Sequence, residues 1–205
     1  MISTLVKVSP ITHLSDARYC AGMGVEMLGF SIDENTENFI DLPKFQEIKA
    51  WITGVKIVVE SSQSDAGKLL EQIRQYQPDI VQISDASFLP WLKSEIEQPI
   101  ILSVEANQDA DTIEEILGQN AAYISYFLLQ SKEDVALSGD WPDFLASLAE
   151  RFPILLGFGI SPDNVLECVS RYSLAGIALK GTQELRPGYS DFDTLMEVLE
   201  ALEDD

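Results

Sequence analysis

The chain has 205 residues, of which 46% are apolar, so it is long enough to bury a substantial hydrophobic core. Its formal net charge is −21 at pH 7, from 34 acidic and 13 basic residues. A charge of this sign repels nucleic acids and anionic membrane surfaces, and we expect neither as a partner. The longest apolar runs, such as 99–104, have the length of a strand and not of a membrane span.

Short apolar runs alternate along the chain with amphipathic stretches. Several runs are rich in Val and Ile and apolar at successive positions, which is typical of strands buried on both faces. Each predicted strand is followed by a predicted helix, in the order 4–8 and 14–23, 27–30 and 43–51, 55–59 and 64–75, 80–83 and 88–96, 100–104 and 110–118, 124–129 and 143–151, 154–156 and 162–171, and 176–179 and 192–202.

Helix starts are marked in three of these units. Ser161 precedes Pro162, which predicts a serine N-cap with proline in the first turn, and Ser15-Asp16 and Ser64-Asp65 are weaker starts. Eight strand–helix units in series with short connections imply a parallel sheet, and eight is the number that closes as a barrel. We predict a (β/α)8 TIM barrel that forms a single domain over residues 1–205. A doubly wound open sheet is the alternative.

The first residues carry no basic leader followed by an apolar stretch and a cleavage site, so we expect no signal peptide. The two cysteines, Cys20 and Cys168, fall in predicted helices without a metal-binding or redox spacing. The single histidine, His13, cannot anchor a multi-histidine metal site. We therefore expect a cytoplasmic protein without a bound metal or cofactor.

Functional side chains of such barrels follow the carboxyl ends of the strands. Here these positions are Ser9 and Pro10, 31–38, Glu60 and Ser61, Ser84 and Asp85, Glu105 and Asn107, 130–132, 157–160, and Lys180 and Gly181. The acidic ones could bind a divalent cation or transfer protons. In a chain with 34 acidic residues, chance placement is the alternative.

Three stretches, in order, resemble the phosphoribosylanthranilate isomerase family. Residues 6–12 read Val-Lys-Val-Ser-Pro-Ile-Thr where the family has Val-Lys-Ile-Cys-Gly-Ile-Thr, and Asp16-Ala17 and 24–30 continue the match. Residues 79–83 resemble a strand that ends Val-Gln-Leu-His-Gly, and 155–165 resemble Leu-Ala-Gly-Gly-Leu-x-Pro-Glu-Asn-Val. The resemblance implies a TIM barrel of tryptophan-biosynthesis lineage and an Amadori rearrangement of an aminoaldose to an aminoketose.

The resemblance also implies two catalytic positions, and both are substituted. The family's base is a cysteine at the position of Ser9, and its acid is an aspartate at the position of Gln130. A thiol with a pKa near about 8.5 can be tuned to a thiolate, whereas a serine hydroxyl needs a neighbouring base. A glutamine amide cannot deliver a proton. Because each such group contributes roughly 10²–10⁴-fold, we expect the parental activity to be weak, altered or lost.

Binding positions implied by the resemblance differ as well. The family's arginine after the second strand aligns with Asn38, and its histidine after the fourth aligns with Ser84. The Gly-Gly pair of the phosphate loop reads Phe158-Gly159, and we expect the phenylalanine to obstruct or reshape the approach of a phosphate. Lys7 matches the family's lysine before the motif cysteine, which favours a structural role over a Schiff-base nucleophile.

One anion-binding element is expected to survive, because amides at a helix start can hold an anion and a lysine lies nearby. Its residues are Gly159, Ile160, Ser161, Lys180 and Gly181. A plain helix cap beside a solvated lysine is the alternative. Two hypotheses follow: an isomerase-lineage enzyme with altered chemistry, and a non-catalytic barrel that binds a small anionic metabolite or a protein partner. Either is expected as a monomer or homodimer.

Overall fold

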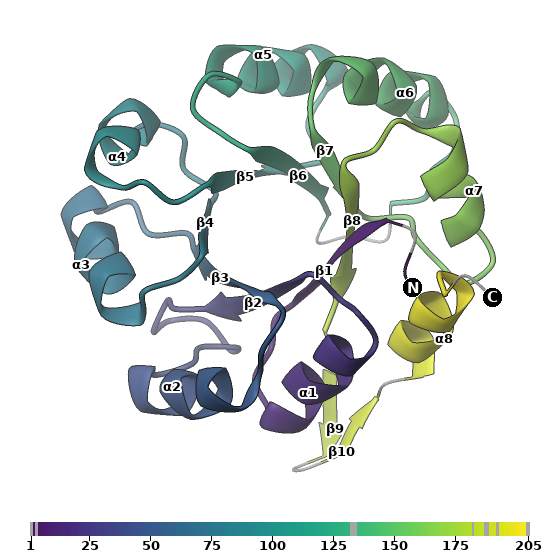
Figure 1. Ribbon diagram of the computed structural model, residues 1–205. Coiled ribbons are helices and arrows are strands. Elements are labelled where there is room, and N and C mark those ends of the chain that lie inside the picture. Colours follow the sequence, from purple (N-terminus) through teal and green to yellow (C-terminus); the bar gives the residue numbers. More distant parts are fainter. Residues whose placement is uncertain are drawn as a thin grey trace.

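A computed structural model describes residues 2, 4–131, 135–181, 183–186, 189–191 and 193–203. Eight parallel strands close into a barrel in the order β1 to β8, and the helices surround it (Figure 1). The strands are β1 (Leu5–Ser9), β2 (Met27–Ser31), β3 (Lys56–Ser61), β4 (Ile80–Ile83), β5 (Ile100–Glu105), β6 (Tyr126–Gln130), β7 (Ile154–Gly157) and β8 (Gly176–Lys180). The helices are α1 (Leu14–Gly22), α2 (Leu42–Trp51), α3 (Ala66–Tyr76), α4 (Leu89–Glu95), α5 (Ala110–Asn120), α6 (Trp141–Arg151), α7 (Val165–Arg171) and α8 (Asp193–Ala201).

The predicted TIM barrel is confirmed, and closure excludes the open sheet. β1 pairs with β8 over five residue pairs, from Leu5 with Gly176 to Ser9 with Lys180. Most strands extend one or two residues beyond the predicted apolar run. Strands pair through backbone hydrogen bonds, so a polar residue can continue a strand. Ser9, Gln130 and Lys180 therefore end their strands instead of following them.

One helix start was predicted wrongly. α7 begins at Val165, and Asn164 and not Ser161 is its N-cap residue. The Asn164 side chain accepts a hydrogen bond from the Ser161 amide at 2.8 Å and donates one to the Gly159 carbonyl at 2.8 Å. An asparagine amide donates through Nδ2 and accepts through Oδ1, and Asn164 uses both atoms to close the turn that precedes α7.

A hairpin between β8 and α8 was not predicted. β9 (Gln183–Arg186) pairs antiparallel with β10 (Tyr189–Asp191), outside the ring of barrel strands (Figure 1). These residues lack the apolar alternation that indicates a strand. Lys132, one of the candidate strand-end residues, lies outside the described part of the chain. No helix in that described part is long and apolar enough to cross a membrane.

The barrel interior contains one apolar layer with a polar layer beyond it. The apolar layer takes one buried side chain from each of β2 to β7: Met27, Val58, Ile80, Ile101, Leu128 and Leu155. Leu5 of β1 and Ala178 of β8 pack against it. Because side chains alternate along a strand, the residue two positions further on each strand also faces inward. Those residues are Lys7, Gly29, Glu60, Gln82, Ser103, Gln130, Gly157 and Lys180. Apolar packing therefore ends abruptly, and the carboxyl end of the barrel is lined by polar groups and glycines.

Candidate functional site

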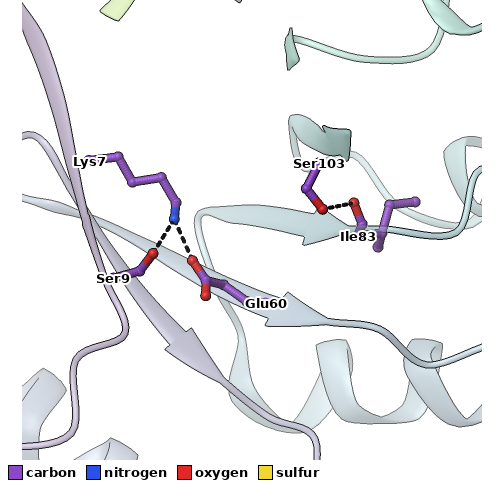
Figure 2. A network of polar contacts seen from close by, with 5 residues as sticks. All are labelled: Lys7, Ser9, Glu60, Ile83 and Ser103. Atoms are coloured by element: carbon purple, nitrogen blue, oxygen red, sulfur yellow. Dashed lines mark hydrogen bonds and ion pairs between the residues drawn. The ribbon is translucent and has the colours of Figure 1, made fainter. Parts of the chain in front are cut away.

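A three-residue network crosses this polar layer from β1 to β3 (Figure 2). Lys7 is fully buried, and its ammonium group donates a hydrogen bond to Ser9 Oγ at 2.7 Å. The same group forms an ion pair with Glu60 Oε1. The Glu60 side chain is 17% exposed, so it lies where the buried interior meets the open end. The network thus connects a buried cation to a carboxylate at the mouth.

Gly29 makes this network possible. It lies on β2, between the two strands that carry the network, and a Cβ there would overlap both Glu60 Oε1 and Ser9 Cβ. Any other residue would separate Lys7 from Glu60 or displace Ser9. Side chains of β1 and β3 make contact over β2 because Gly29 of β2 has no side chain between them.

The network also determines whether the Ser9 hydroxyl can be activated as a nucleophile. Lys7 is paired with a carboxylate, so it is an ammonium group that donates and has no lone pair with which to accept the serine proton. A nucleophilic serine needs a base within hydrogen-bond reach. The Ser9 hydroxyl is held here as an acceptor and has no base at Lys7.

Gln130 is held by a different carboxylate. Its side-chain Nε2 donates to Glu105 Oε1 at 3.1 Å, and the two residues are cross-strand partners on β6 and β5. The amide is therefore oriented as a donor and, unlike a carboxyl group, has no ionisable proton to give to a substrate. Ser9 ends β1 and Gln130 ends β6, so both lie at the carboxyl end of the barrel.

Gln82 is a site feature that the sequence did not single out. It is the cross-strand partner of Glu60, is 7% exposed, and its Oε1 is buried without a hydrogen-bond partner among the described residues. Leaving a buried acceptor unpaired costs about 1–3 kcal/mol, so such an atom marks a place where a donor is missing. The available signal was a lone polar residue inside the apolar run 80–83.

Phe158 does not obstruct the mouth. It follows the inward Gly157 on β7, belongs to the core between barrel and helices, and is 6% exposed. Its ring meets that of Trp141 on α6 edge to face, with centroids 4.8 Å apart. The expectation of an obstructed approach is therefore wrong at this residue, because strand alternation turns the ring outward.

The residues expected to bind an anion are brought to the ends of β7 and β8, but two of their amides are already bonded. The Ser161 amide is used by Asn164, and the Gly181 amide donates to the Ser9 carbonyl at 2.8 Å. Gly159 has a φ of 66°, and Ile160 is half-buried. Lys180 is exposed and pairs in register with Ser9, so it supplies a cation at the rim.

Two other strand-end acidic residues, Asp33 and Asp85, have local structural partners. Asp33 accepts hydrogen bonds from the Ser61 hydroxyl and from the amide and hydroxyl of Ser62, at 2.6 to 2.7 Å. Asp85 accepts one from the Ser87 amide at 2.9 Å. In the described part of the chain no three His, Cys, Asp or Glu side chains gather as a metal site. These contacts disfavour the cation-binding reading of the strand-end carboxylates.

A groove of about 470 Å³ opens beside the mouth, between the ends of β4 and β5 and helix α5. Ser84, Asp85, Ser103, Glu105 and Gln108 are among the residues that line it. Ser84 is exposed here, whereas Asn38 is exposed in the separate loop after β2. The two positions implied by the resemblance therefore contribute small polar side chains and no charge.

Neither cysteine is available for chemistry at the mouth. Cys20 on α1 and Cys168 on α7 are buried and form no disulfide, as expected from the sequence. Burial, and then the nearby Asp16 carboxylate, raise the pKa of the Cys20 thiol to about 12. Burial also raises the pKa of Cys168. Both are therefore protonated, packed thiols at neutral pH.

The chain is similar to proteins of known activity over nearly its whole length. No protein-family model matches it. It is 26% identical to the N-(5'-phosphoribosyl)anthranilate isomerase of a Synechococcus strain, covering 96% of this chain and 89% of that protein. It is 25% identical to the isomerase of Petrotoga mobilis, covering 96% of each.

Solved structures show the same fold. The phosphoribosylanthranilate isomerase of Thermotoga maritima superposes with a TM-score of 0.80 at 20% identity, over 97% of this chain and 98% of that one. The enzyme of Pyrococcus furiosus gives a TM-score of 0.75 at 15% identity, with the same coverage. A third structure holds an isomerase in complex with reduced 1-(o-carboxyphenylamino)-1-deoxyribulose 5-phosphate, with a TM-score of 0.78 at 20% identity, again over 97% and 98%.

Proposed function

We propose, from the membership of the phosphoribosylanthranilate isomerase family that these relatives support, that this chain is an isomerase-lineage barrel whose parental activity is weak, altered or lost. One observation carries the proposal. The two positions that the family uses for proton transfer hold Ser9, whose hydroxyl is occupied by the Lys7 ammonium, and Gln130, whose amide is occupied by Glu105. Neither group gains or loses a charge near neutral pH, so neither is suited to act as the acid or base.

The size of the expected defect follows from the chemistry. A general acid or base contributes roughly 10²–10⁴-fold to a rate, and two are replaced here. The rest of the mouth remains lined by polar groups and glycines, which supports binding of a small metabolite. The loss of both groups should therefore lower the turnover of the parental reaction.

The decisive experiment restores both groups. Purified wild-type protein should convert N-(5'-phosphoribosyl)anthranilate slowly or not at all, and should not support growth of a tryptophan auxotroph that lacks the isomerase. The variant Ser9→Cys/Gln130→Asp should turn over at least about 100-fold faster, because it regains a thiol and a carboxyl group. Product formation is followed by fluorescence.

A matched control makes the same two replacements outside the mouth, as Ser64→Cys/Gln46→Asp at exposed positions. It should behave as the wild type. Growth of the auxotroph on the wild-type gene at the rate given by a true isomerase would contradict the proposal.

A non-catalytic barrel that binds a small anion is the second candidate. It is favoured by the exposed Lys180 at the rim, beside Gly159, Ile160, Ser161 and Gly181. The bonded amides of Ser161 and Gly181 leave the lysine as the main attraction. The experiment above separates the candidates, because a barrel that has lost its substrate site stays inactive when Ser9 and Gln130 are replaced.

We further propose a single-domain, cytoplasmic protein, monomeric or homodimeric, without nucleic acid or membrane as a partner. The charge of −21 supports the last point. The isomerase of Thermotoga maritima is described as a dimer from which monomers were generated, so both states occur among structural neighbours. Size-exclusion chromatography with light scattering distinguishes them for this chain.

A further inference from the structure

Glu60 has the geometry of a proton-transfer group. Its Oε1 is fixed by the buried Lys7 ammonium, and no residue of the described chain forms a hydrogen bond to Oε2. The side chain reaches the mouth, being 17% exposed. A carboxylate that is ionised, held in place and open on one oxygen meets the geometric requirement for a general base.

A second, independent observation indicates what lies beside it. Gln82 is the cross-strand partner of Glu60 and faces the same interior, with a buried Oε1 that accepts no hydrogen bond from the described residues. It is more than nine-tenths buried, so water at the surface does not satisfy it. The missing partner is a donor, and a ligand hydroxyl fits a neutral acceptor next to a carboxylate.

We propose that Glu60 is the general base of this barrel, acting on a polyhydroxylated ketose or aldose whose hydroxyl donates to Gln82 Oε1. The proposal rests on the isomerase lineage argued above and names the altered chemistry. The base would then come from position 60 instead of position 9. The side chains of Glu60 and Ser9 lie close together over Gly29, so the two bases would act from nearly the same place.

The step balances without an oxidant. Glu60 Oε2 takes the proton from the carbon next to the carbonyl, and the C–H electron pair forms a carbon–carbon double bond. The carbonyl π pair moves to oxygen, which takes a proton from water at the mouth and gives an enediol. Glu60 then returns its proton to the adjacent carbon, while the second hydroxyl releases its proton to water and becomes the new carbonyl.

The test follows deuterium uptake from D₂O into C1 of D-ribulose 5-phosphate by proton NMR. Wild-type protein should catalyse the exchange. Glu60→Gln should slow it at least about 100-fold, and Glu60→Asp, which keeps the carboxylate, should recover part of the rate. Glu26→Gln is the matched control, since Glu26 is exposed at the opposite end of the barrel, just before β2, and should leave the rate unchanged.

Glu60→Gln leaves Lys7 buried without its counter-charge and could fail to fold for that reason alone. The double variant Lys7→Met/Glu60→Gln removes both charges together, and when folded it should be as slow as the single variant. Exchange at the wild-type rate by the folded double variant overturns the proposal, as does the absence of exchange by the wild type. Neither result depends on turnover of N-(5'-phosphoribosyl)anthranilate, which tests the proposed function separately.

Discussion

At the scale of single residues, the mouth is organised by one buried ammonium group. Lys7 needs a counter-charge, because an uncompensated ion in the interior is strongly destabilising. Glu60 supplies that charge. Both residues could be picked out in the sequence, as a lysine inside a strand and an acid at a strand end. Their contact could not, because it depends on the missing side chain of Gly29 on the strand between them.

Gly29→Ala tests this packing. A Cβ at position 29 overlaps Glu60 Oε1 and Ser9 Cβ, so the variant should lose about 1–3 kcal/mol of unfolding free energy in a urea titration. Gly118→Ala is the control, since position 118 is on the exposed side of helix α5, where the added Cβ meets open space, and the variant should be neutral or more stable by up to about 1 kcal/mol. Equal stability of Gly29→Ala and wild type would refute the overlap.

At the scale of elements, strands were easier to predict than helix starts. Apolar runs placed all eight barrel strands, because burial on both faces leaves a strong pattern. Asp65 caps α3 by accepting from the Lys68 amide at 3.0 Å, close to the start suggested by Ser64-Asp65. The start of α7 was missed because Ser161 and Asn164 are both good cap residues, and only the three-dimensional turn decides between them.

Asn164→Ala and Ser161→Ala form a matched pair for this turn. Asn164 makes two hydrogen bonds, to the Ser161 amide and the Gly159 carbonyl, so its loss should cost about 1–3 kcal/mol. The Ser161 hydroxyl does not cap α7, and its removal should change stability by less than about 0.5 kcal/mol. Thermal unfolding measures both, and the opposite ranking would restore Ser161 as the cap.

At the scale of the whole molecule, the eightfold rhythm of strands and helices predicted the barrel without any family resemblance. The same rhythm predicted that Ser9, Glu60, Gln130 and Lys180 share one end. It could not predict which of them touch, since contacts across the barrel depend on the register of strands far apart in sequence. The sequence likewise could not predict that Gln82 Oε1 is buried without a hydrogen-bond partner among the described residues, because this depends on how the side chains pack inside the barrel.

The reactivity of the two buried cysteines measures whether the whole barrel stays folded. Because the Cys20 thiol has a pKa of about 12 in the fold, well above its ordinary value, it stays protonated and unreactive at mildly alkaline pH. Cys168 is buried with its pKa shifted in the same direction. A disulfide reagent such as dithionitrobenzoate should therefore label neither until the protein unfolds, and both in guanidinium chloride. Rapid labelling of the native protein would show that α1 or α7 opens locally.

The Lys7–Ser9–Glu60 network over Gly29 also limits which substitutions can be accepted at these positions during evolution. A descendant that loses the positive charge at position 7 is left with an uncompensated carboxylate at 60, and one that gains a side chain at 29 forces the two apart. These positions should therefore change together or not at all. Among homologues of this chain, lysine at 7, glycine at 29 and an acid at 60 are expected to co-vary as one unit, separately from the residues at 9 and 130.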